Sequence, residues 1–529
     1  MARHAQRRKD GLLPAAQRRS AEGAQGRLLS VGEAAGRCMI RKAIEKLLST
    51  AAILGMLAVV PGCASYHPRP LSAKQSAASF SHRSLTNAGL RAFMQSRIGY
   101  PITPWPPKTW TLDRLTLAAL HYHPQLSLAR SQWAIARAKA VTAGAYPNPT
   151  LKLMPFPQYM SNAAAGVSPW TIGLSVDIPI LTAGKRSYRV AEALARARAA
   201  RFDVEQVAWR IRVNLRKSLI ELYAARRKAE LLNTRSQDAA ALLAALRQRL
   251  AAGQISRFQV VQARLQWTNA QLSRADAKTA EIQARTALAG ALGVPPSALR
   301  GVQIDFHTLQ VLPAPKTIPR IRFETYALTR RPDIRAALMR YAASEQALQL
   351  EIARQYPNLQ VGPGYQWDQG DRRWAIGLSL RLPIFNQNQG PIAEARAQRE
   401  RAAARFRVLQ AQIRTQLDSA LVGYRASYHE LELAQHLLSA VRVRLASARA
   451  TCRAGETSRV DLLRIRLEAQ SDQLAVLKAH IRSERALAML EDALEHPLHQ
   501  PTPASRAIQR VASPLHTPSN AQPAKTSSS

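Results

Sequence analysis

The chain has 529 residues, only 6% of them aromatic, and a formal net charge of +41. This composition is typical of long helices with narrow apolar stripes rather than of a thick globular core. The basic residues are spread along the whole chain instead of clustered, which argues against nucleic-acid binding. Three scattered cysteines, Cys38, Cys63 and Cys452, are too few for a disulfide framework or a cysteine-based metal site.

The N-terminal segment predicts export. From Met39, which we expect to be the true start, a basic stretch precedes an apolar run that ends at Cys63. This arrangement forms a secretory signal, and Pro61 interrupts the run too early for a membrane span. The segment from Val60 to Cys63 resembles a bacterial lipobox, so we expect Cys63 to be lipidated. The alternative is an ordinary signal peptide that is cleaved near Ala64.

Short motifs recur about two hundred residues apart. The matched pairs are Tyr-Pro-Asn at 146–148 and 356–358, Ile-Gly-Leu-Ser at 172–175 and 376–379, and the glycines Gly253 and Gly455. Shared order and nearly constant spacing indicate a tandem duplication in which each half is one structural unit.

Each half contains segments in which apolar and polar residues alternate. The clearest alternation runs over 170–178 in the first half and over 359–367 and 374–382 in the second. A period of two predicts strands with one apolar face, and about ten residues suffice to cross a bilayer at a tilt. The first strand, Thr150 to Phe156, is less regular and carries Lys152. A hairpin of a soluble β-sandwich is the alternative interpretation.

Helical periodicity follows each pair of strands. Residues 185–252 contain neither Gly nor Pro, which predicts one helix of roughly 100 Å. Gly253 and Gly455 then end the long helices, and returning helices are expected over about 257–292 and 459–495. Each Tyr-Pro-Asn triplet lies where a helix must stop and a strand begin, because proline forbids further helix. We interpret the apolar stripes as helix packing, with no cofactor implied.

The predicted fold is mainly α with a transmembrane β-barrel portion. Four strands cannot close on themselves, and an open sheet edge in lipid leaves backbone groups without hydrogen bonds. The chain is therefore expected to oligomerise, and three copies would form a barrel of twelve strands.

The duplicated halves, the lipobox, the Tyr-Pro-Asn triplets and the paired glycine turns resemble the outer membrane efflux proteins of the TolC family over residues 108–495. The segment 382–393 is most similar to the branch that works with cobalt-zinc-cadmium type heavy-metal pumps. The resemblance implies a homotrimer whose barrel lies in the outer membrane and whose helices form a tunnel across the periplasm. It also implies two partners, a periplasmic adaptor and an inner-membrane pump of the RND type.

The function implied is passive exit of substrates, heavy-metal cations first among them, through a lipid-anchored outer membrane channel. A multidrug efflux channel and a type I secretion channel are the alternatives. A periplasmic adaptor or a structural coiled-coil lipoprotein would be a different class, but an adaptor would show a lipoyl-like β domain. No catalytic grouping occurs, so we expect no enzyme, no cofactor and no metal site. His121 and His123 could bind a metal, but their position before Pro124 near a helix end favours the interpretation that they are surface residues.

The family resemblance also assigns roles to the two turns between long helices. The expected docking surface for the adaptor consists of Gly253, Ser256, Gly455 and Ser458. The glycines suit a backbone reversal with positive φ, and the serines can cap the returning helices. Asp461 matches an acidic position at which the tunnel narrows in the family, but Arg464 replaces the second acidic residue. An Asp461–Arg464 contact is therefore expected to form the tunnel gate, unless both residues are merely solvated.

These inferences divide the chain as follows. The expected parts are a leader and signal peptide (1–62), a lipidated segment (63–107), the first repeat (108–300), an equatorial linker (301–325), the second repeat (326–496) and a disordered tail (497–529).

Overall fold

The computed structural model describes residues 66–153, 158–159, 166–498 and 506–508. The fold presented below is that of the unit Lys74–Ser529. Its first helices are α2 (Ala73–Ser81), whose first residue precedes that unit, and α3 (Ala88–Ile98). The predicted signal peptide, the start at Met39 and the lipidation site Cys63 lie outside the described residues.

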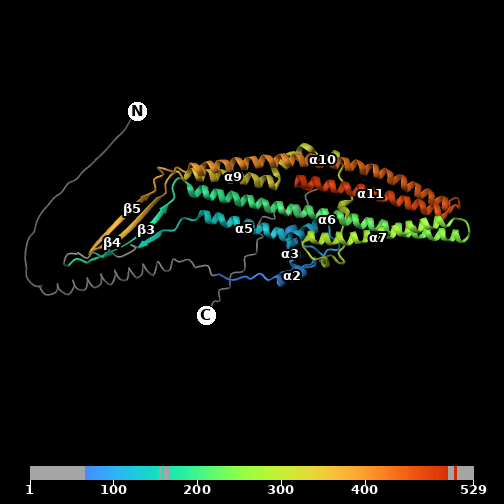
Figure 1. The fold of residues 1–529 in the computed structure, drawn as a ribbon, viewed down its shortest axis with the longest axis horizontal. Coiled ribbons are helices and arrows are strands. Elements are labelled where there is room, and N and C mark those ends of the chain that lie inside the picture. Colours follow the sequence, from blue (N-terminus) through green and yellow to red (C-terminus); the bar gives the residue numbers. More distant parts are fainter. Residues whose placement is uncertain (1–65, 154–157, 160–165, 499–505, 509–529) are drawn as a thin grey trace, which may run out of the picture. The chain divides into compact units, whose positions relative to one another are not determined.

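The two halves of the chain repeat one order of elements (Figure 1). The first half contains α4 (Leu112–Tyr122), α5 (Pro124–Gly144), β1 (Thr150–Leu153), β2 (Gln158–Tyr159), β3 (Trp170–Ile180), α6 (Lys185–Ala251) and α7 (Arg257–Leu292). The second contains α8 (Arg320–Arg330), α9 (Pro332–Ala353), β4 (Leu359–Asp368), β5 (Asp371–Leu380), α10 (Gln389–Arg453) and α11 (Arg459–Leu494). The short helices η1 (Pro296–Leu299), η2 (His307–Leu309) and η3 (Pro315–Thr317) connect the halves. The tandem duplication is confirmed.

The long helices match the sequence prediction closely. α6 has 67 residues and α10 has 65, which correspond to about 100 Å each at 1.5 Å per residue. Both end at the predicted glycines, where φ is +71° at Gly253 and +81° at Gly455, a conformation that glycine adopts without steric cost. Among the described residues, no helix combines the length and the apolar character that a membrane span requires.

The strands form a sheet that joins the two repeats. Its order is β1-β3-β4-β5 with antiparallel pairing, and β2 also pairs with β3. β3 belongs to the first repeat and β4 to the second, so the central ladder crosses the repeat boundary. As predicted, each Tyr-Pro-Asn triplet separates a helix from a strand: α5 ends at Gly144 before Thr150, and α9 ends at Ala353 before Leu359.

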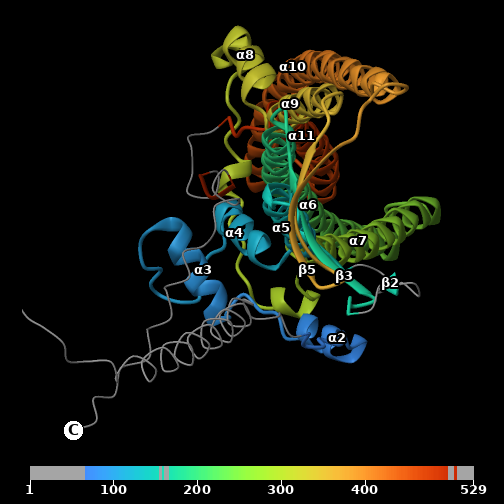
Figure 2. The same ribbon diagram turned by 90° about the vertical axis from the view of Figure 1, so that its left-hand side faces the viewer.

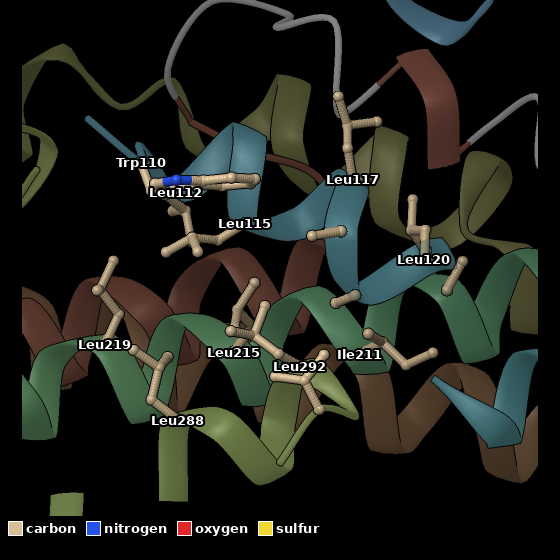
Figure 3. Close-up of a cluster of buried hydrophobic side chains, with 14 of the residues drawn as sticks. Trp110, Leu112, Leu115, Leu117, Leu120, Ile211, Leu215, Leu219, Leu288 and Leu292 are labelled. Atoms are coloured by element: carbon tan, nitrogen blue, oxygen red, sulfur yellow. The ribbon is translucent and has the colours of Figure 1, made fainter. Parts of the chain in front are cut away.

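α6 lies at the centre of the helical region. It packs against α4, α5, α7, α9 and α11, so it contacts both repeats. Figure 3 shows part of the main hydrophobic core, in which α4 lies on α6 and the end of α7 closes the cluster. The leucines and isoleucine in this contact are Leu112, Leu115, Leu117, Leu120, Ile211, Leu215, Leu219, Leu288 and Leu292. Burial of each side chain contributes roughly 1.5–3 kcal/mol.

One part of the C-terminal tail departs from the sequence prediction. Residues 506–508 form a helical turn, in which Ala507 and Ile508 are buried within the same core. The prediction of a disordered tail is therefore wrong for these three residues, because two apolar side chains find space against the helical core. The rest of the tail after Leu498 lies outside the described residues.

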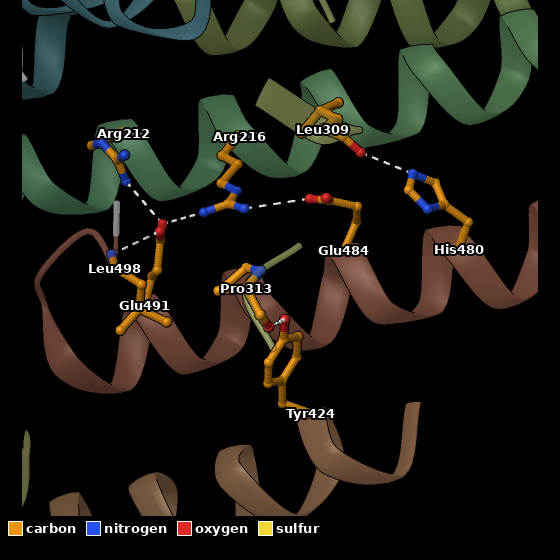
Figure 4. A network of polar contacts seen from close by, with 9 residues as sticks. All are labelled: Arg212, Arg216, Leu309, Pro313, Tyr424, His480, Glu484, Glu491 and Leu498. Atoms are coloured by element: carbon orange, nitrogen blue, oxygen red, sulfur yellow. Dashed lines mark hydrogen bonds and ion pairs between the residues drawn. The ribbon is translucent and has the colours of Figure 1, made fainter. Parts of the chain in front are cut away.

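A buried network of charges joins α6 of the first repeat to α11 of the second (Figure 4). The guanidinium of Arg216 pairs with the carboxylate of Glu491, and its Nη2 lies 3.3 Å from Oε2 of Glu484. Nη1 of Arg212 lies 3.3 Å from Oε2 of Glu491. The backbone N–H of Leu498 donates to Oε1 of the same carboxylate at 3.1 Å.

This network keeps its charges although water is excluded from it. Arg216 is 3% exposed and Glu491 is 1% exposed. Burial alone would lower the pKa of Arg216, but the carboxylates of Glu491 and Glu484 raise it above its ordinary value. Removing either partner from such a pair leaves the other charge buried without compensation, which strongly destabilises the folded state. The network therefore fixes the register of α6 against α11.

The linker between the repeats is fastened beside this network. A ring nitrogen of His480 lies 2.8 Å from the carbonyl oxygen of Leu309, and the hydroxyl of Tyr424 donates to the carbonyl oxygen of Pro313 at 2.5 Å. Both carbonyls belong to the predicted linker, so α10 and α11 hold it in place.

We predict that Glu491→Ala lowers the free energy of unfolding by about 3–5 kcal/mol, because Arg216 would remain buried without that carboxylate. The measurement is chemical unfolding of detergent-purified protein, followed by circular dichroism. Glu221→Ala is the matched control, because Glu221 of α6 pairs with Arg485 of α11 on the same helix pair but both side chains are about half exposed, a setting in which a pair contributes roughly 0–1 kcal/mol. Equal effects of the two substitutions would contradict the stabilising role of the network.

Candidate channel surface and helix turns

One face of the sheet is apolar across all of its long strands. Cross-strand partners bring like residues together: Leu174 lies opposite Tyr365, and Tyr365 lies opposite Trp374. The apolar face comprises Leu151, Leu153, Ile172, Leu174, Val176, Ile178, Ile180, Leu359, Val361, Pro363, Tyr365, Trp367, Trp374, Ile376, Leu378 and Leu380. Trp374 and Ile376 are each 81% exposed. The predicted alternation is confirmed, and it leaves an apolar surface for which water is a poor solvent.

The opposite face of the sheet is polar, and its charged groups contact one another. Lys152 forms an ion pair with Asp177, which explains a lysine in an otherwise apolar strand. Nη1 of Arg373 lies 2.7 Å from Oδ2 of Asp368, and the hydroxyl of Thr171 donates to Oδ1 of Asp368 at 2.6 Å. This face therefore suits water, with opposite charges placed in pairs.

The sheet has two open edges, β1 and β5. Every residue of β5 is exposed, and on the outer side of each edge strand the described residues provide no further strand. Such edges pair readily with another chain. In a hydrocarbon environment that pairing is obligatory.

A lysine holds the second Tyr-Pro-Asn triplet in place. Nζ of Lys185, at the start of α6, donates to the carbonyl oxygen of Tyr356 and to Oδ1 of Asn358, both at 2.5 Å. The hydroxyl of Thr182 donates to the carbonyl oxygen of Pro357 at 2.5 Å. Sequence analysis missed this clamp, because it joins residues more than 170 positions apart and has no local signal.

Among the described residues, the first Tyr-Pro-Asn triplet has no such lysine contact, and two arginines bind the backbone just before it. Nε of Arg189 donates to the carbonyl oxygen of Ala143, and Nε of Arg186 donates to that of Gly144, each at 2.8 Å. The guanidinium of Arg186 also lies over the ring of Tyr146 at 4.2 Å. These contacts satisfy the carbonyls that the end of α5 leaves without intrahelical partners.

The predicted caps at the two helix turns are only half realised. Ser256 and Ser458 both occupy the N-cap position of the returning helix. Ser458 accepts the backbone N–H of Asp461 at 3.2 Å, and its hydroxyl donates to the Asp461 carboxylate at 2.6 Å. Ser256 makes no side-chain cap bond. The Ser458–Asp461 arrangement is a capping pair that stabilises the start of α11.

The predicted contact between Asp461 and Arg464 is present but weak. Nη1 of Arg464 lies 3.6 Å from Oδ1 of Asp461, and both side chains are about half exposed. Such pairs contribute at most about 1 kcal/mol, and this one lies within a single helix. Arg464 also borders a groove of about 530 Å³ between α6, α7 and α11.

The histidine pair has a structural explanation. Nδ1 of His123 accepts the backbone N–H of Gln125 at 3.3 Å and so caps α5. His121 stacks with Phe93, their ring centroids 5.1 Å apart. Within the described part of the chain, no group of three or more His, Cys, Asp or Glu side chains gathers to hold a metal ion.

Comparison with known proteins agrees with this geometry. A family model described as outer membrane efflux protein matches residues 115–294 and 325–495. The cobalt-zinc-cadmium resistance protein CzcC of Cupriavidus metallidurans is 28% identical over 317 residues, which cover 59% of this chain and 73% of that protein. The pyoverdine export outer membrane protein OpmQ of Pseudomonas aeruginosa is 27% identical over 319 residues, covering 56% of this chain and 64% of that protein.

A solved structure shares the fold. The crystal structure of the Campylobacter jejuni CmeC outer membrane channel aligns with a TM-score of 0.61 at 16% identity, covering 86% of this chain and 98% of that one. At this identity, the likeness establishes the common fold.

We predict that the two faces of β5 respond oppositely to arginine. Leu378→Arg should impair assembly in the membrane, because arginine on a lipid-facing position near the bilayer midplane costs roughly 2–4 kcal/mol. Ser379→Arg, on the polar face of the same strand, is the matched control and should be tolerated. The measurement is the amount of heat-modifiable oligomer in outer membrane fractions. Equal tolerance of both substitutions would rule out a membrane-facing apolar surface.

Proposed function

The chain belongs to the outer membrane efflux protein family, whose model matches both of its repeats, and from that premise we propose that it is the outer membrane channel of a tripartite efflux system. In this proposal an inner-membrane pump of the RND type delivers substrate through a periplasmic adaptor. The channel then provides passive exit across the periplasm and the outer membrane. A lipid at Cys63 is part of the proposal.

The observation that carries the proposal is the exposed apolar face of a sheet whose two edges are open. Lipid is the solvent that suits residues such as Trp374 and Leu378, and edge pairing with further copies removes the open edges. Three copies would supply twelve strands, as the sequence analysis expects. The polar face, with the Lys152–Asp177 and Arg373–Asp368 pairs, would then line a water-filled pore.

The long helices support the second half of the path. α6 and α10 extend away from the sheet over about 100 Å each, far more than an ordinary domain needs. In the proposal they form the wall of a periplasmic tunnel, with the turns at Gly253 and Gly455 at its inner end.

Heavy-metal cations are the proposed cargo. The similarity to CzcC and the segment 382–393 support this cargo. The pairing of opposite charges on the polar face of the sheet means that this surface does not strongly repel a cation. The similarity to OpmQ, which is named as a pyoverdine export protein, favours the export of an organic small molecule as a second candidate. A passive tunnel recognises little, so the choice of cargo rests mainly with the pump.

The experiment that tests the function compares a deletion strain with strains complemented by wild type or by Cys63→Ala. We predict that the deletion raises cell-associated zinc, cobalt and cadmium and lowers tolerance to them, and that wild type restores both. Cys63→Ala should slow maturation but retain part of the tolerance, because the strands rather than one lipid chain provide permanent attachment.

Two results would count against this proposal in different ways. Unchanged metal content together with a loss of drug or other small-molecule export would reject heavy metals as the cargo but leave the channel function intact. Complete loss of Cys63→Ala from the membrane would reject attachment through the sheet.

At the inner end, we propose that Gly253, Ser256, Gly455 and Ser458 meet the adaptor. The supporting observation is that both turns are exposed at the same end of the helices. The Asp461–Arg464 pair lies one turn above the second of them. Because that pair lies within α11, it can hold the tunnel narrow only by fixing the position of the Arg464 side chain.

We predict that Arg464→Ala raises the closed-state conductance of purified channel in a planar bilayer, because it removes a long side chain from the narrow end. Asp461→Ala should have a smaller effect on conductance and weaken the start of α11 by about 1 kcal/mol, since it removes half of the capping pair. Arg449→Ala, at an exposed site on α10 near the same turn, is the control. If Arg464→Ala and Asp461→Ala both leave the closed-state conductance unchanged, the gate proposal is rejected. The docking proposal is not affected by that result.

A further inference from the structure

The aromatic residues of the sheet gather at one end of its strands. Tyr159 lies opposite Trp170, and their ring centroids are 5.3 Å apart. Tyr365 lies opposite Trp374, and their ring centroids are 4.9 Å apart. Trp367 follows two residues after Tyr365, on the same face of β4. At the other end of the strands this face carries only aliphatic residues, which are Ile178, Ile180, Leu359, Val361, Leu378 and Leu380.

The aromatic end of the sheet is the end away from the long helices. The turn between β4 and β5 consists of Gln369 and Gly370, and Figure 1 shows the β4–β5 hairpin pointing away from the starts of α6 and α10. In the proposed function the long helices extend into the periplasm, so this turn faces the exterior of the cell. The aromatic rings then lie at the outer boundary of the hydrocarbon layer, where amphipathic rings are favourable.

Arg372 is the one charged residue on the apolar face of the described strands. It lies directly opposite Trp367 in the ladder and two residues before Trp374 on β5, so the three side chains share one face. The residue is exposed. Among the described residues, no carboxylate lies within ion-pairing distance of its guanidinium. A charge on a lipid-facing surface is costly, and such residues are normally paired.

The neighbouring Arg373 is in the opposite situation. Its Nη1 lies 2.7 Å from Oδ2 of Asp368, and its Nη2 lies 3.9 Å from Oδ2 of Asp371. All three residues belong to the polar face of the sheet. The end of the hairpin therefore supplies carboxylates for the arginine that faces the proposed pore and none for the arginine that faces the membrane. At a membrane boundary, the anions available to such a cation are lipid headgroups.

We propose that Arg372, together with Trp367 and Trp374, binds a phosphate group of a lipid in the outer leaflet. The inference rests on the proposed function, which places the turn between β4 and β5 at the outer face of the membrane. The planar guanidinium can donate two parallel hydrogen bonds to phosphate oxygens. Each indole ring contacts the acyl chains with its apolar body and can donate its N–H into the headgroup layer.

A lipid fits this surface better than a soluble anion or a protein. Arg372 stands on the same face as Trp374 and Ile376, which are each 81% exposed. A free phosphate would satisfy the guanidinium but leave these side chains in water. A phosphorylated lipid supplies the anion and the apolar chains in one molecule, with the order of headgroup and hydrocarbon that the strand presents.

The test is a titration of the detergent-purified, full-length oligomer with diphosphoryl lipid A, followed by native mass spectrometry. Arg372→Gln should weaken binding at least about tenfold, because it removes a charged donor to the phosphate. Arg372→Lys should recover part of the affinity, since the charge returns without the planar fork. Its result stands by itself if Arg372→Gln fails to assemble. Arg373→Gln is the matched control, because it removes the same charge from the neighbouring residue on the polar face, and it should leave the affinity unchanged.

Two further probes separate the lipid phosphate from its alternatives. Inorganic phosphate at the same concentrations should not bind measurably, and a diacylglycerol, which lacks phosphate, should bind wild type and Arg372→Gln equally. The proposed site would be overturned if Arg372→Gln bound lipid A as tightly as wild type, or if Arg373→Gln lost as much affinity as Arg372→Gln. Binding of inorganic phosphate as tight as that of lipid A would also overturn it.

The same preparations distinguish failure of the site from failure of the proposed function. If wild type forms conducting oligomers in a planar bilayer but shows none of the expected differences in lipid binding, only the lipid site is rejected. If wild type is absent from outer membrane fractions, the site and the proposed function are rejected together.

Discussion

A backbone edge in hydrocarbon must be paired, and this constraint governs the molecule. Each unpaired N–H or C=O in lipid costs several kcal/mol, yet β1 and β5 leave the sheet open on both sides. The apolar face of the sheet favours contact with lipid. The unpaired edge strands, however, would make it unfavourable for a single chain to enter the hydrocarbon region. Association with further strands would therefore be obligatory for this sheet in a membrane, and the proposed oligomer meets that requirement.

The two repeats share one order of elements, but they are not interchangeable. The residues that precede α6 and α10, Gly184 and Asn388, both have left-handed backbone, with φ of 70° and 65°. The next position holds Lys185 in the first repeat and Gln389 in the second. Lys185 binds the Tyr-Pro-Asn triplet of the second repeat, so the contact within one chain carries a charge that its counterpart lacks. The contact between the repeats inside one chain therefore depends on a lysine that has no counterpart at the start of α10.

The sequence was sufficient to predict the helices and strands, but not the side-chain contacts between residues far apart in the chain. Helix and strand limits follow from local periodicity and from glycine and proline, so α7 and α11 are placed to within one residue. The Arg216–Glu491 pair joins residues 275 positions apart, and no local pattern announces it. Similarly, Ser256 has the right identity and position for a cap but makes no cap bond. Turn geometry was predictable, whereas side-chain partners were not.

The basic composition has a structural cause in the helix ends. Carbonyls in the last turn of a helix lack intrahelical donors and also carry partial negative charge. Arg83 donates to the carbonyl oxygens of Tyr122 and Gly293 at the ends of α4 and α7. Arg186 does so for α5 and Arg331 for α11. A fold in which many helices stop against neighbours needs fixed cationic donors at those points. Some of the arginines therefore serve the protein's own backbone as donors to helix-end carbonyls.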